Sequence, residues 1–170
     1  MSDADDFCRD VWPRLAASLG FYCHDRALGE ELAQEALARA WARWNRVSAL
    51  DSPEAWVYRV ALNLSHSRFR RARAERRAMS RVIVPSPDIE AMGRSTDAIA
   101  VRAAVAQLPE RQRAAIVLRY FAGMSVREVA EVMKCPENTV KTHTRRGLDA
   151  LRRCGLVDDA EPAPRVEELR

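Results

Sequence analysis

The stretch LPERQRAAIVLRYFAGMSVREVAEVMKCPENTVKTHTRRGLDALRR, residues 108–153, carries the strongest structural signals in the chain. Gly123 follows an apolar run, at a position where a glycine commonly ends a helix. Ser125 and Glu128 are three residues apart in the pattern of a capping box, so a new helix is expected from about residue 126. Apolar residues at helical spacing give this helix one buried stripe, made of Val126, Val129, Ala130 and Met133.

A second helix is expected directly after this one. Lys134 and Cys135 form a short turn, and Pro136 stands where a first helical turn tolerates proline. The helix would bury Val140, Gly147, Leu148 and Leu151 and leave basic and hydroxyl side chains on its other faces. Such a pair of helices is the helix-turn-helix that enters the major groove of DNA. An ordinary helical hairpin with a solvated charged face is the alternative, but the caps, the turn length and the apolar spacing agree independently.

Charge is distributed unevenly along the 170 residues. The hydrophobic fraction of 48% and the charged fraction of 31% are typical of a soluble globular protein, and the net charge is only +4. Between residues 68 and 81, however, seven arginines stand against one glutamate, whereas residues 1–6 and 158–168 are acidic. A basic patch of this kind is the electrostatic footprint of a nucleic-acid-binding protein.

Composition and motifs exclude several other classes of function. The four cysteines are scattered, and the neighbours Cys23 and His24 lack further ligands at metal spacing, so neither a metal nor a cofactor is expected. Ser65 and His66 lack a catalytic partner pattern, and a glycine-rich phosphate loop is missing, so we do not expect an enzyme. The sequence shows neither a signal peptide nor an apolar run of membrane-spanning length. We therefore expect a cytoplasmic protein with reduced thiols.

The sequence predicts an all-α chain of two small helical domains joined by a flexible linker. Residues 7–81 form the first domain and residues 96–153 the second, which contains the helix-turn-helix. Residues 82–95 include VPSPDIEAMGRS, whose prolines and glycine indicate a linker. Residues 154–170 form a tail that buries little and is expected to be disordered.

Three helices are expected in the first domain. The first starts near Asp6 and ends at Gly20, and the second covers residues 28–44. Ser52 caps the third helix, Pro53 occupies its first turn, and the helix continues into the arginine-rich segment.

Two segments of the first domain resemble region 2 of bacterial sigma factors. They are GEELAQEALARAWARW at residues 29–44 and SPEAWVYRVALNLSHSRFRRARAERR at residues 52–77, and the helix-turn-helix resembles region 4 of the same proteins. Only these two regions are recognisable, which is the layout of the small extracytoplasmic-function (ECF) group. The resemblance implies a sigma factor that binds core RNA polymerase and directs it to promoters. It also implies a separate anti-sigma factor as a partner.

The resemblance places core polymerase binding on the helix that contains LAQE, which would contact the clamp helices of the β′ subunit, while region 4 would meet the β flap. A mixed apolar, acidic and amide surface suits such a partner. The residues that the resemblance assigns to core binding are Leu32, Gln34, Glu35, Leu37, Arg39 and Trp41. Leu32, Ala36 and Trp41 could instead belong to the core of the domain, whereas Gln34 and Glu35 are more typical of an interface.

Promoter melting is implied for the third helix and the loop before it. Stacking on an aromatic ring contributes about 1–3 kcal/mol per unpaired base, and residues 45–54 correspond to the loop that receives a flipped base. Trp56 and Tyr58 are two residues apart and cannot share a helix face. We expect Trp56 to point inward and Tyr58 to face the DNA. The residues expected at the unpaired −10 strand and adjoining duplex are Trp56, Tyr58, Arg59, Asn63, Arg68, Arg70 and Arg71.

For the −35 element, the second helix of the helix-turn-helix supplies the expected contacts, Thr139, Lys141, Thr142, Arg145 and Arg146. His143 could face the DNA or pack inward, and Arg111 and Arg113 are candidates for backbone contacts.

Two other functions fit part of the sequence. One is a free-standing helix-turn-helix regulator that binds symmetric half-sites. The other is a sigma-like antagonist that binds a partner without starting transcription.

Overall fold

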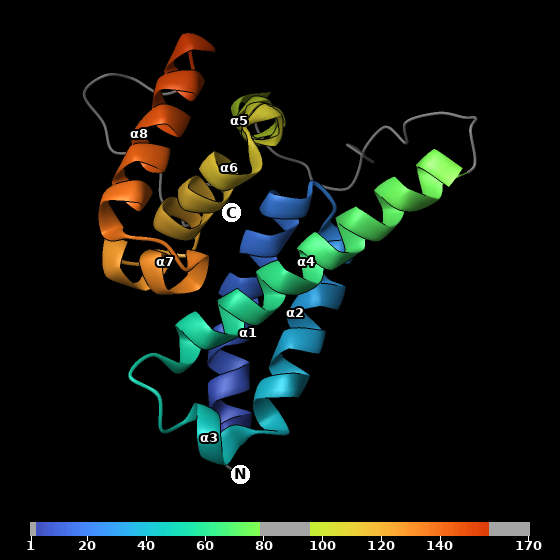
Figure 1. The fold of residues 1–170 in the computed structure, drawn as a ribbon, viewed down its shortest axis with the longest axis vertical. Helices are drawn as coiled ribbons and strands as arrows, with labels where there is room; N and C mark the ends of the chain where they lie inside the picture. Colours follow the sequence, from blue (N-terminus) through green and yellow to red (C-terminus); the bar gives the residue numbers. More distant parts are fainter. Residues whose placement is uncertain (1–2, 79–95, 157–170) are drawn as a thin grey trace.

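The computed structural model describes residues 3–78 and 96–156 (Figure 1). Every regular element in these two ranges is helical, which confirms the all-α fold class. The first range holds α1 (Asp3–Cys23), α2 (Arg26–Trp41), α3 (Trp44–Val47) and α4 (Pro53–Ala78). The second holds α5 (Thr96–Gln107), α6 (Glu110–Ile116), the π-helical turn η1 (Val117–Phe121), α7 (Val126–Met133) and α8 (Glu137–Arg153). The predicted linker at 82–95 and the tail beyond 156 lie outside the described residues.

Helices α1 and α2 pack with their backbones in close contact at two glycines. A Cβ atom on Gly29 would lie only 2.4 Å from the backbone nitrogen of Gly20. The prediction that Gly20 ends the first helix was wrong, because the helix continues to Cys23. The glycine that the close approach requires is Gly29 on α2. His24 then adopts a positive φ of 59°, and Asp25 caps α2 by accepting a hydrogen bond from the Leu28 amide at 2.9 Å.

The second predicted helix is divided in two, because α2 ends at Trp41 and the short α3 follows. The third begins as predicted. The Ala55 amide donates to Ser52 Oγ at 3.2 Å, and α4 runs through the arginine-rich segment to Ala78. Figure 1 shows α4 crossing α1 and α2, with its C-terminal end extending beyond them.

The helix-turn-helix is confirmed together with its local signals. Ser125 and Glu128 form both hydrogen bonds of the capping box, and Gly123 has a φ of 69°. Lys134 adopts a left-handed conformation at the turn, and α8 begins directly after Pro136. The π-helical turn before Gly123 was not predicted. It is marked by the Ala122 amide, which donates to the Val117 carbonyl five residues earlier at 2.9 Å.

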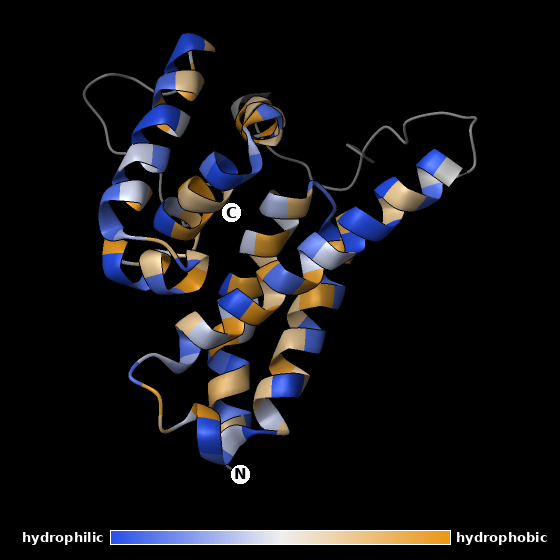
Figure 2. Ribbon diagram, in the orientation of Figure 1, coloured by the Kyte–Doolittle hydropathy of each residue, from blue (hydrophilic) through white to orange (hydrophobic). Residues whose placement is uncertain are grey.

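The two halves of the chain pack against each other at the C-terminal end of α1. The Phe21 and Phe121 rings are 4.1 Å apart between centroids, and the Arg102 guanidinium lies 4.5 Å from the Phe21 ring centroid. Helix α7 also contacts α4. Apolar residues gather where helices face one another, while α8 and the distal half of α4 carry many hydrophilic residues (Figure 2). The described residues therefore form one packed body in which both predicted DNA-binding helices keep polar surface.

Candidate nucleic-acid interface

Helix α8 presents a basic face to solvent. Lys141, Arg145 and Arg146 are exposed, whereas Val140, Gly147 and Leu151 anchor the opposite side in the core. Thr139 and Thr142 are half-buried, and the Thr142 hydroxyl donates to the Asn138 carbonyl at 2.8 Å. Three of the predicted −35 contacts are therefore exposed and can reach bases or phosphates: Lys141, Arg145 and Arg146.

His143 lies half-buried on the same helix. Its pKa is lowered by desolvation and by the positive charges of Arg111 and Arg146. The imidazole is therefore neutral at pH 7 and adds no charge to the basic face. Arg111, a candidate backbone contact, is exposed and donates to the Met133 carbonyl at 3.3 Å.

A second polar face lies along α4. Four of the predicted −10 residues follow one another at intervals of three, four and seven, which places them on one side of the helix: Trp56, Arg59, Asn63 and Arg70. Asn63 and Arg70 are exposed, and Trp56 and Arg59 are half-buried at the edge. These four predicted −10 residues therefore share a surface.

Tyr58 does not belong to that surface. Its side chain is 1% exposed, and burial raises its pKa above the usual range of a phenol. The prediction that Tyr58 faces the DNA was therefore wrong, whereas Trp56 is half-buried and packs against the hydrophobic core. Val57 and Tyr58 are both fully buried where α4 packs on α1 and α2, and Trp56 lies at the edge of this core.

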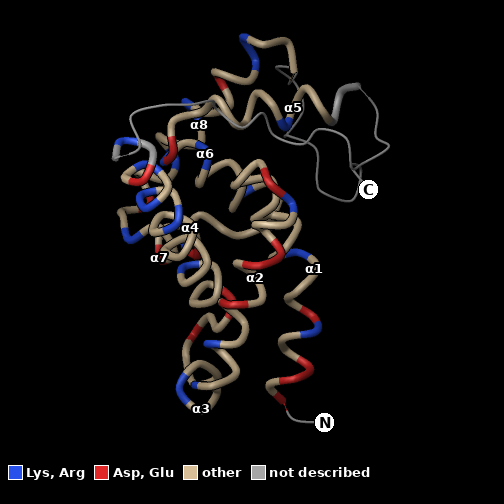
Figure 3. The backbone as a smooth tube through the Cα atoms, turned by 90° about the vertical axis from the view of Figure 1, so that its right-hand side faces the viewer, with Lys and Arg blue, Asp and Glu red and all other residues tan. Residues whose placement is uncertain are grey.

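Further arginines follow along α4, where Figure 3 marks Lys and Arg in blue on the backbone. Arg70 and Arg71 are exposed. Arg68 forms an ion pair with Glu31 of α2, so its contact with a phosphate would require exchange of partners.

Two family models match the chain: "Sigma-70 region 2" matches residues 8–75 and "Sigma-70, region 4" matches residues 98–151. The ECF RNA polymerase sigma factor SigC of Mycobacterium tuberculosis is 30% identical over 158 residues, which cover 91% of this chain and 79% of the relative. The RNA polymerase sigma-H factor of Pseudomonas aeruginosa is 31% identical over 144 residues, covering 76% and 74% of the two chains. The chain belongs to the ECF sigma factors.

A solved structure resembles this ECF sigma factor across both regions. The sigma factor RpoE of Bartonella quintana, in complex with the anti-sigma factor NepR, superposes with a TM-score of 0.82 at 26% identity. The match covers 93% of this chain and 99% of the solved one. Sigma factors are not a family of enzymes.

Region 2 of this ECF sigma factor carries a third surface, on the outer side of α2. Gln34, Glu35, Arg39 and Trp41 are exposed there, Trp41 by 57%. Glu35 and Arg39 form an ion pair at 2.9 Å, and Trp41 Nε1 donates to Asp5 Oδ1 at 3.0 Å. The remaining two predicted core-binding residues, Leu32 and Leu37, are buried in the helical core. Their packing holds α2 in place beneath this surface.

Arg113 has a place that the sequence did not indicate. The guanidinium donates to the Tyr22 carbonyl at 3.2 Å and to the Ala106 and Leu108 carbonyls at 2.7 and 3.1 Å. This arginine of region 4 therefore joins the end of α1 in region 2 rather than pointing to solvent. A sequence signal was lacking because the contact joins residues 91 positions apart.

Within residues 3–78 and 96–156, no group of three His, Cys, Asp or Glu residues could hold a metal ion. No helix in these two ranges is long and apolar enough to cross a membrane.

Proposed function

We propose that this ECF sigma factor binds core RNA polymerase and directs it to a restricted set of promoters. One observation carries the proposal: a single chain combines region 2 and region 4, and each region keeps an exposed polar face on the helix that the family uses for DNA. Polymerase supplies the chemistry, and the sigma factor supplies selection of the start site. Because polymerase is its partner, we place the protein in the cytoplasm.

Region 4 docks on the −35 element through α8. The exposed Lys141, Arg145 and Arg146 enter the major groove or meet its phosphates, with Thr139 and Thr142 at the edge of the contact. Bidentate contacts to guanine give discrimination of about 1–3 kcal/mol per base pair.

Region 2 captures the −10 element once the duplex opens. The exposed part of Trp56 at the edge of α4 stacks on an unpaired base, and Arg59 and Asn63 on the same side contact base edges or the backbone. Arg68, Arg70 and Arg71 hold the adjoining phosphates, which position the helix without reading sequence. Tyr58 supports α4 from below.

Core polymerase binds the outer face of α2. Gln34, Glu35, Arg39 and Trp41 meet the β′ clamp helices, and region 4 meets the β flap. The solved relative is described in complex with an anti-sigma factor, and we propose that a separate anti-sigma factor likewise controls this chain.

Promoter binding requires the two regions to separate. The −10 and −35 elements lie about two helical turns apart, roughly 70 Å at 34–36 Å per turn. In the structure, α7 packs on α4 and η1 packs on α1, so the two DNA-binding helices are held within one body. We therefore propose that the packed arrangement is a resting state that opens on the polymerase.

In vitro transcription with purified core polymerase tests the proposal, using a library of upstream DNA from the organism's own genome. Start sites that share two motifs and depend on the added protein are expected. Specific DNA retention without core binding would point to a free-standing regulator, and core binding without transcripts would point to an antagonist.

Two sets of variants separate the proposed surfaces. Arg145→Ala is expected to reduce −35-dependent initiation about tenfold, since one charged contact is lost, with holoenzyme formation unchanged. Arg153→Ala, at the exposed far end of the same helix, is the matched control and should retain initiation. Gln34→Ala with Glu35→Ala should instead weaken holoenzyme formation. Loss of polymerase binding in the Arg145 variant would contradict the assignment of surfaces.

A further inference from the structure

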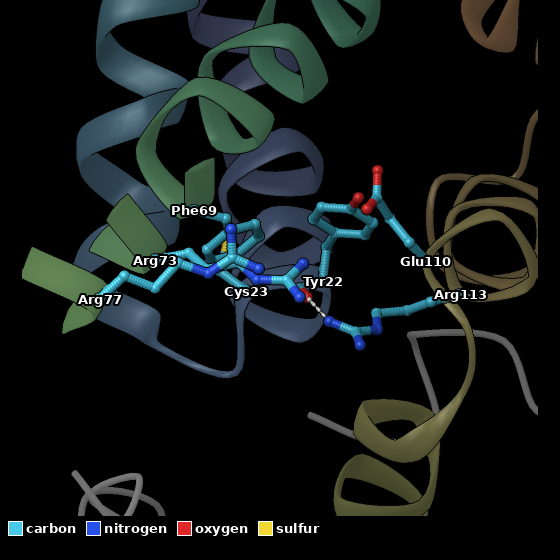
Figure 4. Close-up of a pocket in the computed structure, with 7 residues that line it drawn as sticks. All are labelled: Tyr22, Cys23, Phe69, Arg73, Arg77, Glu110 and Arg113. Carbon is cyan, nitrogen blue, oxygen red and sulfur yellow. Dashed lines mark hydrogen bonds between the residues drawn. The ribbon is translucent and has the colours of Figure 1, made fainter. Parts of the chain in front are cut away.

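An arginine-lined cleft lies between region 2 and region 4. Its volume is about 670 Å³, and it is broadly open to solvent. Figure 4 shows side chains that approach it from α1, α4 and α6. Its lining consists of Tyr22, Cys23, Phe69, Arg73, Arg77, Glu110 and Arg113. The cleft exists only while the two regions are packed together, because Glu110 and Arg113 come from region 4 and the other residues from region 2.

The positive charge of this cleft is poorly balanced within the described residues. Arg113 donates to three carbonyl oxygens, which carry no net charge. Arg73 and Arg77 are exposed, and neither of these arginines has a carboxylate partner among the described residues. Glu110 is the cleft's acidic residue, and its Oε1 lies 2.9 Å from His66 Nε2. Arg73 and Arg77 therefore reach this space with exposed guanidiniums, and Arg113 adds a third positive charge while its own N–H groups donate to carbonyl oxygens.

The arrangement of the guanidiniums suits a chain of phosphate groups. Arg73 and Arg77 are four residues apart on α4, so they lie one above the other on the same side of the helix. Arg113 faces them from the other region. Guanidinium groups bind phosphate with paired hydrogen bonds, and a cleft lined by one sign of charge concentrates counter-ions of the opposite sign.

We propose that this cleft binds a small polyphosphate anion that ties region 2 to region 4. The shared chemistry is the phosphate chain, carried by a nucleoside triphosphate or by inorganic polyphosphate. A ligand held by both regions binds only the packed arrangement, so it shifts the population toward that arrangement. If the proposed function holds, the anion restrains the sigma factor from its promoters, since the regions must separate to reach both elements.

Calorimetric titration of the full chain with sodium tripolyphosphate, at fixed ionic strength near 150 mM so that surface charge is screened, tests the site. The wild type is expected to bind one anion. Arg73→Gln with Arg77→Gln should weaken binding by about tenfold or more, because charged hydrogen bonds contribute about 1.5–3 kcal/mol each.

Arg70→Gln with Arg71→Gln is the matched control. It removes the same charge from the same helix at two exposed residues outside the cleft, and its affinity should stay within about twofold of the wild type, as expected for screened charges. Equal weakening by both pairs would overturn the proposal in favour of diffuse attraction to the basic helix. Equal binding of hexaglutamate would overturn it in favour of a general polyanion surface.

Two further measurements examine the source of the anion and the bridging. ATP that binds much more tightly than tripolyphosphate would indicate a nucleotide whose base also meets the cleft, and equal affinities would indicate that the phosphate chain alone is bound. Phe21→Ala loosens the interface without changing the three arginines of the cleft and should also weaken binding, with circular dichroism confirming the fold. Undiminished binding in a folded Phe21→Ala variant would overturn the bridging role. None of these titrations contains polymerase or promoter, so they stand apart from the transcription test.

Discussion

Region 4 and region 2 reach their folds by different means. In region 4, the elements are set by residues close in sequence: Ser125 and Glu128 start α7, and Gly123 and Lys134 adopt the left-handed conformations that its turns need. In region 2, local caps start α2 and α4, but the contacts that shape the domain join different helices, such as Gly20 with Gly29 and Tyr58 with the helices beneath it. Local signals therefore define the helix-turn-helix proposed to bind duplex DNA, whereas tertiary packing defines the surface proposed for unpaired DNA.

The largest expected effect tests the packing of region 2. Tyr58→Ala should lower the free energy of unfolding by about 3–5 kcal/mol, because a fully buried aromatic side chain is removed. Trp56→Ala should cost roughly 1 kcal/mol, since the ring is only half-buried. Urea unfolding followed by circular dichroism measures both. A larger loss of unfolding free energy in the Trp56 variant than in the Tyr58 variant would instead support the orientations predicted from the sequence.

The next effect compares one glycine from each region. Gly29→Ala should destabilise by about 2–3 kcal/mol, because its Cβ would meet the Gly20 backbone, which cannot turn aside. Gly147→Ala would meet the Ile116 side chain at 2.7 Å, and side-chain adjustment should hold its cost near 1 kcal/mol. The same urea experiment ranks them. Equal costs would mean that region 4 depends on close helix packing as much as region 2.

A smaller effect tests the local signal that starts α7. Ser125→Ala should cost about 1 kcal/mol through the lost N-cap. The Ser125 hydroxyl and amide lower the pKa of Glu128, so the stability that this carboxylate contributes is present above its ordinary pKa and is lost as the pH falls through the lowered value. NMR titration should find the Glu128 pKa closer to its ordinary value in the variant. An unchanged Glu128 pKa in the variant would contradict the role of the capping box at the start of α7.

The smallest effect concerns the boundary between the regions. Burial, followed by the charges of Arg113 and Arg102, lowers the pKa of His24 to about 4. Because the unfolded chain binds the proton more readily, His24 favours the folded state above pH 6.5 and this stabilisation is lost as the pH falls toward 4. Its partial exposure limits the change to roughly 1 kcal/mol.

His24→Asn, which keeps a residue type that tolerates the positive φ of 59°, should flatten the dependence of stability between pH 4 and pH 6.5. Unfolding in urea at pH 5 and at pH 7 measures the difference for both proteins. An identical dependence in the variant would assign it to other groups.

The same division explains how much could be predicted from the sequence. The helix-turn-helix, the start of α4 at Ser52 and the exposed basic residues of α8 follow from caps, spacing and charge. Sequence reasoning could not predict that α1 continues past Gly20 or that Tyr58 is buried, because each depends on which helix packs opposite. The cleft at Arg113 requires both regions at once, so a local pattern does not indicate it.

The π-helical turn η1 makes the length of the chain before Gly123 critical. Its hydrogen bond from Ala122 to Val117 accommodates one residue more than an α-helical turn would hold. Deletion of one residue within η1 would restore regular helix and rotate α6 by about 100° relative to α7, since an α-helix has 3.6 residues per turn. Glu110 and Arg113 would then turn away from α1. A sigma factor descended from this one could therefore exchange side chains in η1 far more readily than it could lose a codon there.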